Sequence, residues 1–287
     1  MEIKRLSVSE LDFLPSICLD PSVGRQLKEI MKKCMEQRIC WIKKMMEYGL
    51  EILVALDIPK SKMIHYKWAG KMKHSDLAIR NYVPMGLLES IPIEFALEPI
   101  EGESSLFINC IWILPPFWNR GVGKTLMRCF IKQANKVGGA SVIAYDGDNW
   151  FGTKIKYMPL SFFRKFGFKE IEREGTRVLL HLDLGSKKLP YFIINKTESV
   201  KPHACEVNIF VNNQCPWSCF MIDDIKKNIK KYPDIRLKIV NTNSREDIRL
   251  YGISRGITID GKPLIKRMVS WSEIKSQFEK NIKSIGD

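Results

Sequence analysis

The chain has 287 residues, 45% of them hydrophobic and 27% charged, and a formal net charge of +14 at pH 7. This composition is typical of a folded globular protein and excludes a disordered chain. The length predicts two domains of ordinary size, each with its own core. No apolar run is long enough to span a bilayer, and the charged residues 1–5 lack the apolar core of a signal peptide, so we expect a cytoplasmic protein.

The net charge indicates the class of ligand, and the cysteines indicate the redox state of the thiols. A charge of +14 creates a field that attracts anions. Because the lysines are spread through every segment without interleaved aromatic residues, they favour a site for an anionic cofactor over a nucleic-acid surface. The eight cysteines form no dense framework, so we expect reduced thiols rather than structural disulfides.

The first third of the chain predicts a strand, a long helix and a second strand. Residues 1–6 and 51–56 are strand-like, and residues 23–48 between them have a helical period. The apolar residues of this helix are Leu27, Ile30, Met31, Cys34, Trp41, Ile42, Met45 and Met46. Methionines adapt to irregular shapes and would suit an acceptor pocket, but this spacing is more often core. Residues 60–80 have no clear period and are predicted to be an exposed connection near the acceptor side.

The middle of the chain predicts further strands and two helices. Residues 107–114 form an apolar run that Pro115-Pro116 ends, as expected of a strand covered on both faces. Residues 122–137 follow as an amphipathic helix that stops at Gly138-Gly139. The other expected elements are strands at 85–93, 95–99 and 141–145, a loop at 146–152, a helix ending at Phe166, and strands at 168–172 and 177–184. This order is an α+β pattern.

The turn between that apolar strand and its helix carries the clearest functional signal. It reads Asn119-Arg120-Gly121-Val122-Gly123-Lys124-Thr125. The two glycines let the backbone turn sharply, and the new helix presents free N–H groups and its positive dipole end, which suits a phosphate or pyrophosphate. A Walker loop is disfavoured because Trp118 stands where its first glycine is needed, and a Rossmann turn because Leu126 replaces its third glycine. The alternative is an ordinary strand-to-helix turn.

The last third of the chain predicts a second unit. Residues 185–190 and 195–203 are polar and turn-rich, which indicates a linker. From Cys205 onward the expected elements are strands at 206–211, 235–240, 257–259 and 266–269, and helices at 221–231, 245–251 and from Trp271. Cys215 and Cys219 lie in the turn after the first of these strands.

Two landmarks together resemble the GNAT N-acetyltransferase family. The turn Trp118-Asn119-Arg120-Gly121-Val122-Gly123 matches both glycines of the family's [QR]-x-x-G-x-[GA] signature, with Trp118 in place of the leading Gln or Arg. The sequence Ser161-Phe162-Phe163-Arg164-Lys165-Phe166-Gly167-Phe168 is similar to the end of the last GNAT helix. The resemblance implies an α+β GNAT fold over residues 1–190 and acetyl-CoA as cofactor.

The stretch 85–126 and the tail are similar, more narrowly, to the YoaP-like subgroup. This implies a linker at 191–204 and a small thioredoxin-like or glutaredoxin-like α/β domain at 205–287. In such a domain the dipole of the following helix would lower the pKa of the Cys215 thiol. The spacing C-x-x-x-C and the Arg255-Gly256 pair, where that resemblance expects a cis-proline, both weaken a disulfide-exchange role. A module for packing or homodimerisation is the alternative, and a soft-metal site of Cys215, Cys219 and Cys205 is another.

The GNAT resemblance also implies where the cofactor is held. Backbone groups of the strand, at Trp112, Ile113 and Leu114, would hold the pantetheine arm, and Lys124 would add charge to the pyrophosphate site. Arg120 would compensate for the missing Gln or Arg. The turn residues expected around the pyrophosphate are Asn119, Arg120, Gly121, Val122, Gly123, Lys124 and Thr125.

Acetyl transfer to an amine also needs a base and an acid. Glu89 and Glu94 are the candidate bases, and strand alternation prevents both from facing the cleft. We favour Glu89, because burial among apolar neighbours raises a carboxyl pKa, although a solvent-exposed glutamate is the alternative. The family's usual tyrosine acid falls on Phe163, so Tyr157 is the substitute, with Ser161 or no acid as alternatives. Cys110 is interpreted as a buried inert thiol, and we expect no metal site.

Two functions remain open from the sequence. The first is an acetyl-CoA-dependent N-acetyltransferase, a transferase of the acyltransferase class, that acts on the amine of a small molecule or peptide. The second is a coenzyme A-binding protein that senses thiol state or a soft metal through Cys215 and Cys219.

Overall fold

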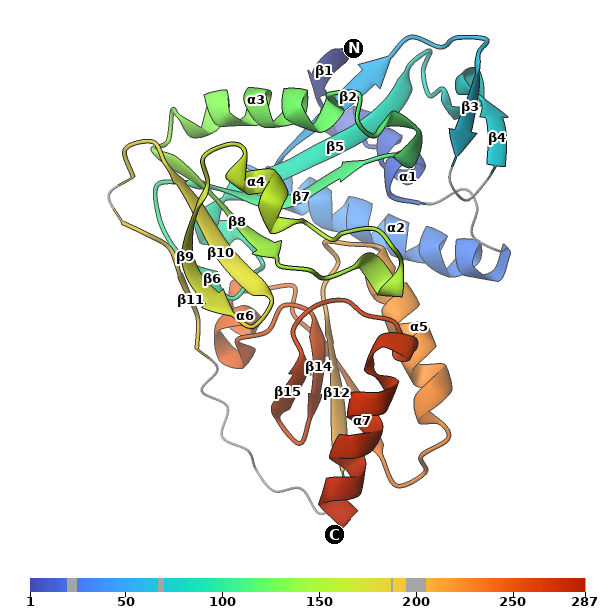
Figure 1. Cartoon of the computed structure of the whole chain (residues 1–287), viewed down its shortest axis with the longest axis vertical. Coiled ribbons are helices and arrows are strands. Elements are labelled where there is room, and N and C mark those ends of the chain that lie inside the picture. Colours follow the sequence, from blue (N-terminus) through green and yellow to red (C-terminus); the bar gives the residue numbers. More distant parts are fainter. Residues whose placement is uncertain (20–24, 67–69, 187, 195–204, 287) are drawn as a thin grey trace.

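A computed structural model of the chain describes residues 1–19, 25–66, 70–186, 188–194 and 205–286. The expected linker residues 195–204 lie outside this part, as does the side chain of Leu27. Figure 1 shows an N-terminal unit above a C-terminal unit. Most buried hydrophobic residues of the N-terminal unit form one cluster, and most of those of the C-terminal unit form another.

The N-terminal unit is built on a seven-stranded sheet with the order β1-β2-β5-β7-β8-β10-β9. In that order the strands are Glu2–Arg5, Glu51–Asp57, Val83–Pro92, Leu106–Ile113, Gly139–Tyr145, Arg177–Asp183 and Lys169–Glu174. All neighbours are antiparallel except β7 and β8. The strands expected from the sequence around this central region are therefore confirmed.

Helices cover the sheet on both sides (Figure 1). Helix α3 (Val122–Ala134) packs against β2, β5 and β7 through Val122, Leu126, Met127, Phe130 and Ala134, which recur at helical spacing and are buried. Helix α2 (Arg25–Met46) lies on the opposite side, where it contacts the C-terminal unit. The shorter helices are α1 (Phe13–Cys18) and α4 (Leu160–Arg164).

Two sequence expectations in this unit are wrong. Residues 95–99 form no strand, because β5 ends at Pro92 and a 3-10 helix follows at Ile93–Phe95. Residues 60–80 are not a plain connection, since β3 (Met63–Tyr66) and β4 (Gly70–Lys73) pair as a hairpin. A further pair joins β6 (Ile100–Glu101) to β11 (Tyr191–Phe192).

The C-terminal unit has a four-stranded sheet with the order β13-β12-β14-β15. The chain runs through β12 (Glu206–Val211), α5 (Trp217–Ile229), β13 (Arg236–Asn241), α6 (Arg245–Tyr251), β14 (Gly256–Ile259), β15 (Lys262–Ile265) and α7 (Trp271–Gly286). Strands β12 and β13 are parallel, and β14 and β15 are antiparallel to their neighbours. The last strand thus lies before the expected residues 266–269, because Asp260-Gly261 form the tight turn that starts it.

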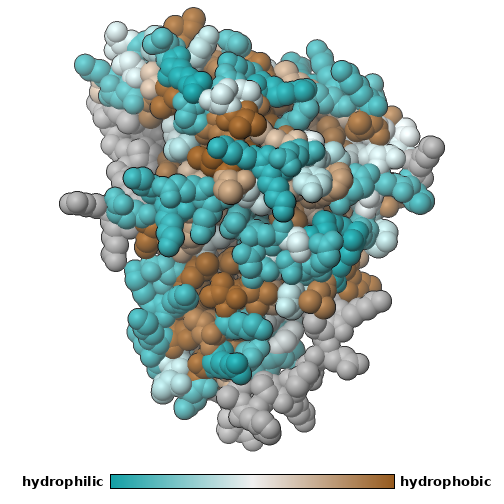
Figure 2. Space-filling view, turned by 180° about the vertical axis from the view of Figure 1, so that it is seen from behind, coloured by the Kyte–Doolittle hydropathy of each residue, from teal (hydrophilic) through white to brown (hydrophobic). Residues whose placement is uncertain are grey.

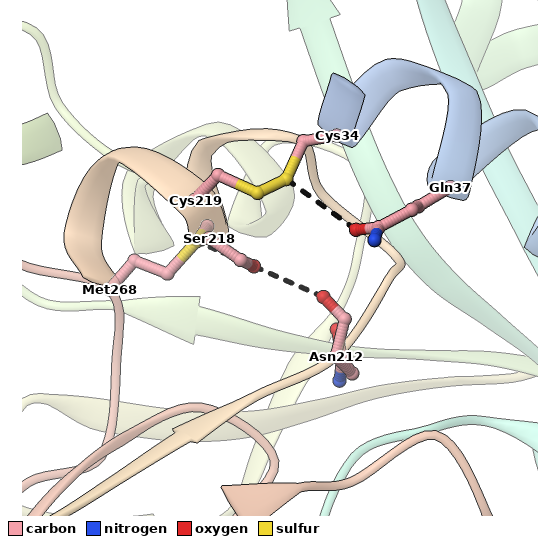
Figure 3. The surroundings of a disulfide bond; sticks show 6 residues. All are labelled: Cys34, Gln37, Asn212, Ser218, Cys219 and Met268. Carbon is pink, nitrogen blue, oxygen red and sulfur yellow. Dashed lines mark hydrogen bonds between the residues drawn. A yellow bond between two sulfur atoms is a disulfide. The ribbon is translucent and has the colours of Figure 1, made fainter. Parts of the chain in front are cut away.

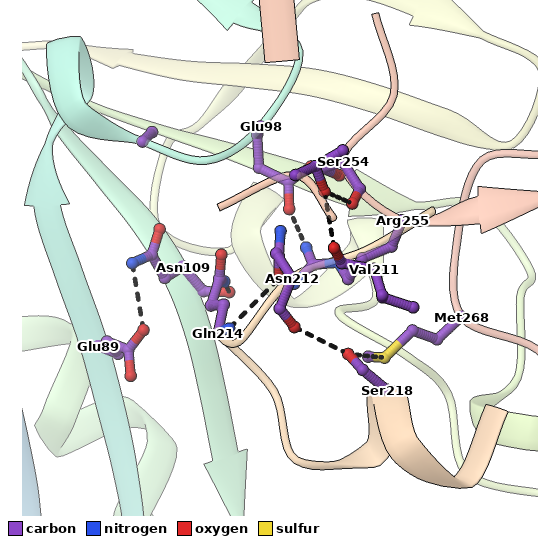
Figure 4. Close-up of polar contacts among 12 residues, drawn as sticks. Glu89, Glu98, Asn109, Val211, Asn212, Gln214, Ser218, Ser254, Arg255 and Met268 are labelled. Atoms are coloured by element: carbon purple, nitrogen blue, oxygen red, sulfur yellow. Dashed lines mark hydrogen bonds and ion pairs between the residues drawn. The ribbon is translucent and has the colours of Figure 1, made fainter. Parts of the chain in front are cut away.

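Buried polar contacts join the two units. Arg245 donates to the carbonyl oxygens of Ala96, Glu98 and Ile100 at 2.7 to 2.9 Å. The Glu98 carboxylate pairs with Arg255 and accepts a hydrogen bond from Ser254 at 2.7 Å (Figure 4). Because these contacts satisfy carbonyls and charges that would otherwise be buried alone, they fix how the units are docked.

A disulfide also joins the units, which corrects the expectation of reduced thiols. Cys34 on α2 is bonded to Cys219 on α5, with the two Cα atoms 6.3 Å apart and a sequence separation of 185 (Figure 3). The two bonded cysteines lie far apart in the sequence, and the packing of α2 against α5 brings them together. The other six cysteines are free.

The outer surface is mostly hydrophilic on the face shown in Figure 2, although apolar residues lie between the polar ones there. Among the described residues we find no helix with the length and apolarity that crossing a membrane requires.

Candidate functional site

Strands β7 and β8 separate shortly after they begin, and this opening is the centre of the candidate site. They pair only at Leu106↔Ala140 and Phe107↔Ser141. On its other side β7 stays paired with β5, apart from a bulge at Asn109, which lies between the pairs Ser90↔Ile108 and Glu89↔Cys110. The last residues of β7 therefore leave one edge without a neighbouring strand in the described chain.

The free edge of β7 presents backbone groups of alternate residues. Leu114 donates its N–H to the Met85 carbonyl, so the amides of Trp112 and Leu114 point toward β5. The amides of Ile111 and Ile113 then point toward the opening. The Ile113 carbonyl accepts the indole N–H of Trp118 at 2.7 Å. Of the three expected backbone contacts, only Ile113 thus turns its amide toward the opening, and the expectation for the amides of Trp112 and Leu114 is wrong because both point toward β5. Trp112 still lines the cavity described below.

The glycine turn lies at the end of this opening. Asn119 has φ 59° and Gly121 has φ 78°, so the chain turns through left-handed backbone before α3 begins. Within the described chain, the backbone N–H groups of residues 119–124 donate to no protein acceptor. Lys124 and Arg120 are exposed beside them. Thr125 is different, because its N–H and hydroxyl both donate to the Gly121 carbonyl.

This turn is suited to an anion such as a phosphate or pyrophosphate. Free N–H groups at a helix N-terminus bind anions, and two cationic side chains stand next to them. A Cβ atom built on Gly123 would lie 3.4 Å from the Phe162 ring and 3.7 Å from Ile113, so Gly123 faces the space between β7 and α4. A Cβ on Gly121 would meet nothing within 4 Å, which leaves that side of the turn open.

A cavity of about 430 Å³ lies beyond the free edge of β7. Most of its wall comes from three places: Asn109, Cys110, Ile111 and Trp112 of β7; most of the segment 150–159 after β8; and residues Gln214, Cys215, Pro216, Trp217 and Phe220 at and just before the start of α5. The remaining lining residues are Ile17, Cys18, Arg38, Leu87 and Arg255. A volume of this size suits a small-molecule site. The cavity is thus closed by both units.

Glu89 lies next to this cavity in a buried ion pair. Its carboxylate accepts a hydrogen bond from Arg38 at 2.7 Å. It accepts another from the Asn109 side-chain amide at 3.1 Å (Figure 4). Glu89 and Arg38 are 0% and 2% exposed. Burial was expected for Glu89, but the countercharge of Arg38 was not, and it stabilises the carboxylate. Arg38 and Asn109 line the cavity, and Glu89 lies behind them.

Glu94 is not at the site. It lies in the 3-10 helix after β5 and accepts a hydrogen bond from the backbone of Ser104 at 3.1 Å. Its side chain is exposed.

Tyr157 lines the cavity, whereas Phe163 does not. Tyr157 packs between Tyr145 and Trp150, with ring centroids 4.8 Å from each. Burial raises the pKa of Tyr157 well above its ordinary value, so the phenol keeps its proton at neutral pH. Phe163 is fully buried in the N-terminal core.

The free thiols around the cavity are half-buried and keep their protons at neutral pH. Burial raises the pKa of Cys215 to about 12 and raises the pKa values of Cys110 and Cys18 as well. The expected lowering of the Cys215 pKa by the helix dipole is therefore wrong, because the N-terminal unit covers this turn and desolvation dominates.

The soft-metal interpretation finds no support in this geometry. Cys219 is bonded to Cys34 rather than placed beside Cys215. Among the described residues, no group of three or more histidine, cysteine or acidic side chains is arranged to hold a metal ion.

Sequence reasoning missed three polar residues of the cavity. Arg38 stands on the buried face of α2, among Met31, Met35 and Ile42, so an arginine inside an apolar helical face was the available signal. Asn109 similarly interrupts the apolar run of β7. Gln214 belongs to the other unit, and nothing local in the sequence indicates its place.

Comparisons with known proteins agree with the geometry of the N-terminal unit. Residues 30–151 match the model of the acetyltransferase (GNAT) family. The matched residues include β7, the glycine turn and α3. The uncharacterized N-acetyltransferase YoaP of Bacillus subtilis (strain 168) is 25% identical over 165 residues, which are 56% of this chain and 62% of that relative. The matched region thus spans less than two thirds of the relative's length.

Two solved structures show a partial similarity. The PaiA N-acetyltransferase of Thermoplasma acidophilum, solved in complex with coenzyme A, is 16% identical with a TM-score of 0.38, and the match covers 64% of this chain and 99% of that one. A GNAT family acetyltransferase of Brucella melitensis, solved in complex with acetyl-CoA, is 12% identical with a TM-score of 0.34, and the match covers 66% and 90%.

Proposed function

We propose that this protein is an N-acetyltransferase that transfers the acetyl group of acetyl-CoA to the amine of a small molecule or peptide. The observation that carries this proposal is the run of free N–H groups at residues 119–124, placed at the end of the free edge of β7. The match of residues 30–151 to the GNAT family supports it.

The chain's own residues can hold such a cofactor along its length. The turn N–H groups and Lys124 would bind the pyrophosphate. The amides of Ile111 and Ile113 would pair with the pantetheine arm as a neighbouring strand does. Acetyl-CoA, when bound, would supply the acetyl group as a thioester at the cavity end of this path.

The proposed catalytic groups are Tyr157 and Glu89. Tyr157 borders the cavity and carries a hydroxyl proton, so it is the proposed donor to the leaving thiolate. Glu89 lies behind Arg38 and Asn109, so a proton from the amine would reach it through water. Holding the amine and the thioester side by side supplies much of the rate enhancement in reactions of this kind.

We also propose that residues 205–287 form a thioredoxin-like domain, that residues 1–190 form the GNAT domain, and that 191–204 link them. The thioredoxin-like domain is supported by the β-α-β-α-β-β-α order of its elements and by the strand arrangement β13-β12-β14-β15. The same order supports a YoaP-like subgroup. Since Cys215 keeps its proton and Cys219 is already bonded, we assign this domain a binding role rather than thiol exchange.

The variant Lys124→Ala tests the cofactor site. We expect the acetyl-CoA dissociation constant to rise about tenfold, because one charge-assisted contact to the pyrophosphate is lost. Lys132→Ala removes an exposed lysine near the other end of α3 and serves as the matched control. Both dissociation constants are measured by calorimetry. If Lys124→Ala and Lys132→Ala bind acetyl-CoA with equal affinity, Lys124 does not contact the pyrophosphate.

A further inference from the structure

The cavity beside β7 is built from both units, and the C-terminal unit supplies a substantial part of its wall. The residues contributed by that unit are Gln214, Cys215, Pro216, Trp217, Phe220 and Arg255. Trp217 is held in place by a hydrogen bond from its indole N–H to the Cys18 carbonyl at 3.0 Å. The part of the cavity wall that comes from the C-terminal unit is therefore packed against the N-terminal unit.

Aromatic rings from the two units meet along this wall. Trp217 lies 6.0 Å from Trp150 and 5.8 Å from Phe151, measured between ring centroids. Phe151 and Phe220 are 5.1 Å apart. Phe151 also has φ 46°, a left-handed conformation that is strained for a non-glycine residue and is retained mostly where function requires it. This wall suits an apolar or aromatic body.

Two wall residues on the β7 side of the cavity each carry a side-chain oxygen that lacks a donor in the described chain. The side-chain oxygens of Asn109 and Gln214 are buried and accept no hydrogen bond within the described chain. Their orientation is fixed, because the Asn109 amide donates to Glu89 and the Gln214 amide donates to the Asn109 carbonyl at 3.1 Å. Asn109 is 8% exposed and Gln214 is 3% exposed. A buried acceptor without a donor is unfavourable, and a ligand N–H would satisfy it.

The charges around the cavity limit the ligand further. Its described lining includes Arg38, Arg255 and Lys156 but no aspartate or glutamate. Arg38 is paired with Glu89 and Arg255 with Glu98, and neither carboxylate lines the cavity. With no carboxylate in the described wall, the cavity offers nothing to pair with the second or third ammonium group of a polyamine.

The geometry points to an acceptor that is a small monoamine with an aromatic body, enclosed between the two units. This inference rests on the proposed acetyl transfer. The amine N–H groups donate to the side-chain oxygens of Asn109 and Gln214, and the aromatic body packs against Trp150, Trp217 and Phe220. The C-terminal unit is thus part of the acceptor site, and Gln214 is a specificity residue supplied by it.

Three amines test this inference: 2-phenylethylamine, tryptamine and spermidine. We expect wild-type kcat/KM to be at least about tenfold higher for either aromatic amine than for spermidine. In Gln214→Met, which keeps the volume but removes the acceptor, we expect KM for 2-phenylethylamine to rise about tenfold. The acetyl-CoA dissociation constant should stay within about twofold of the wild-type value, since Gln214 lies away from the turn. Leu250→Met, at an exposed site of the same unit, is the control.

Calorimetry with 2-phenylethylamine, in the presence and absence of coenzyme A, separates the two claims. Binding that Gln214→Met weakens supports the inference, even if no acetyl transfer is detected. A wild type that binds acetyl-CoA but turns over spermidine as well as the aromatic amines overturns the inference and leaves the proposed function standing. Equal KM values in Gln214→Met, Leu250→Met and the wild type overturn the role of Gln214.

Discussion

The variant Arg38→Met is expected to lower the free energy of unfolding by about 3–5 kcal/mol. The substitution leaves the Glu89 carboxylate buried without its countercharge, since the Asn109 amide is then its only partner in the described chain. A single uncompensated buried charge costs far more than the net value of the pair it belonged to. Chemical denaturation followed by circular dichroism measures the change.

Two further variants show whether the charge is the cause. Arg38→Met combined with Glu89→Gln removes both charges, and we expect it to recover most of the lost stability. Arg249→Met breaks the pair with Glu101, in which Arg249 is 54% exposed, and should cost less than about 1 kcal/mol. If Arg38→Met is as stable as Arg249→Met, the Glu89 carboxylate is not held as a buried ion.

Opening the bond between Cys34 and Cys219 is the second change with a large expected effect. The bond joins residues separated by 185 positions, and a loop of that length gives about 5 kcal/mol of stabilisation in the chain-entropy account as an upper value. We expect Cys219→Ser, or reduction by dithiothreitol, to lower the denaturation midpoint clearly. Since α5 carries part of the cavity wall, KM for the acceptor should rise as well.

The control for this prediction is Cys40→Ser, which removes an exposed free thiol. Thiol titration of the denatured, unreduced protein should find six free cysteines, which is eight in the chain less the two that are bonded. Eight free thiols, with no effect of dithiothreitol on the midpoint, would contradict the cross-link. In a reducing compartment such as the cytoplasm the bond would be at risk of opening.

The sequence was most informative where local chemistry alone decides the structure. Pro115-Pro116 ends β7, Gly121 permits the left-handed turn, and the apolar period from Val122 onward begins α3. These signals act within a few residues, so they predicted the strand, turn and helix with nearly correct bounds. The burial of Glu89 also followed from its apolar neighbours.

The rest depends on contacts between distant segments. Residues 95–99 resemble a strand, but the carbonyls of Ala96 and Glu98 accept hydrogen bonds from Arg245 of the other unit. Cys215 stands before a helix, yet the N-terminal unit buries it and raises its pKa. The Cys34–Cys219 bond and the place of Gln214 follow from docking of the two units, which no local pattern in the chain specifies.

A calorimetric titration with acetyl-CoA tests the central claim most directly, in the wild type and in Gly123→Val. We substitute Gly123 rather than Gly121, because Gly121 has a left-handed φ that a valine would adopt only with strain, whereas Gly123 does not. Valine at 123 would fill the space beside Phe162 and Ile113, and Lys132→Val adds the same side chain at an exposed site on α3 as the control. We predict a micromolar dissociation constant for the wild type and for Lys132→Val, and binding at least about 100-fold weaker for Gly123→Val. No binding by the folded wild type, or equal binding by all three proteins, would contradict a coenzyme A site at this turn.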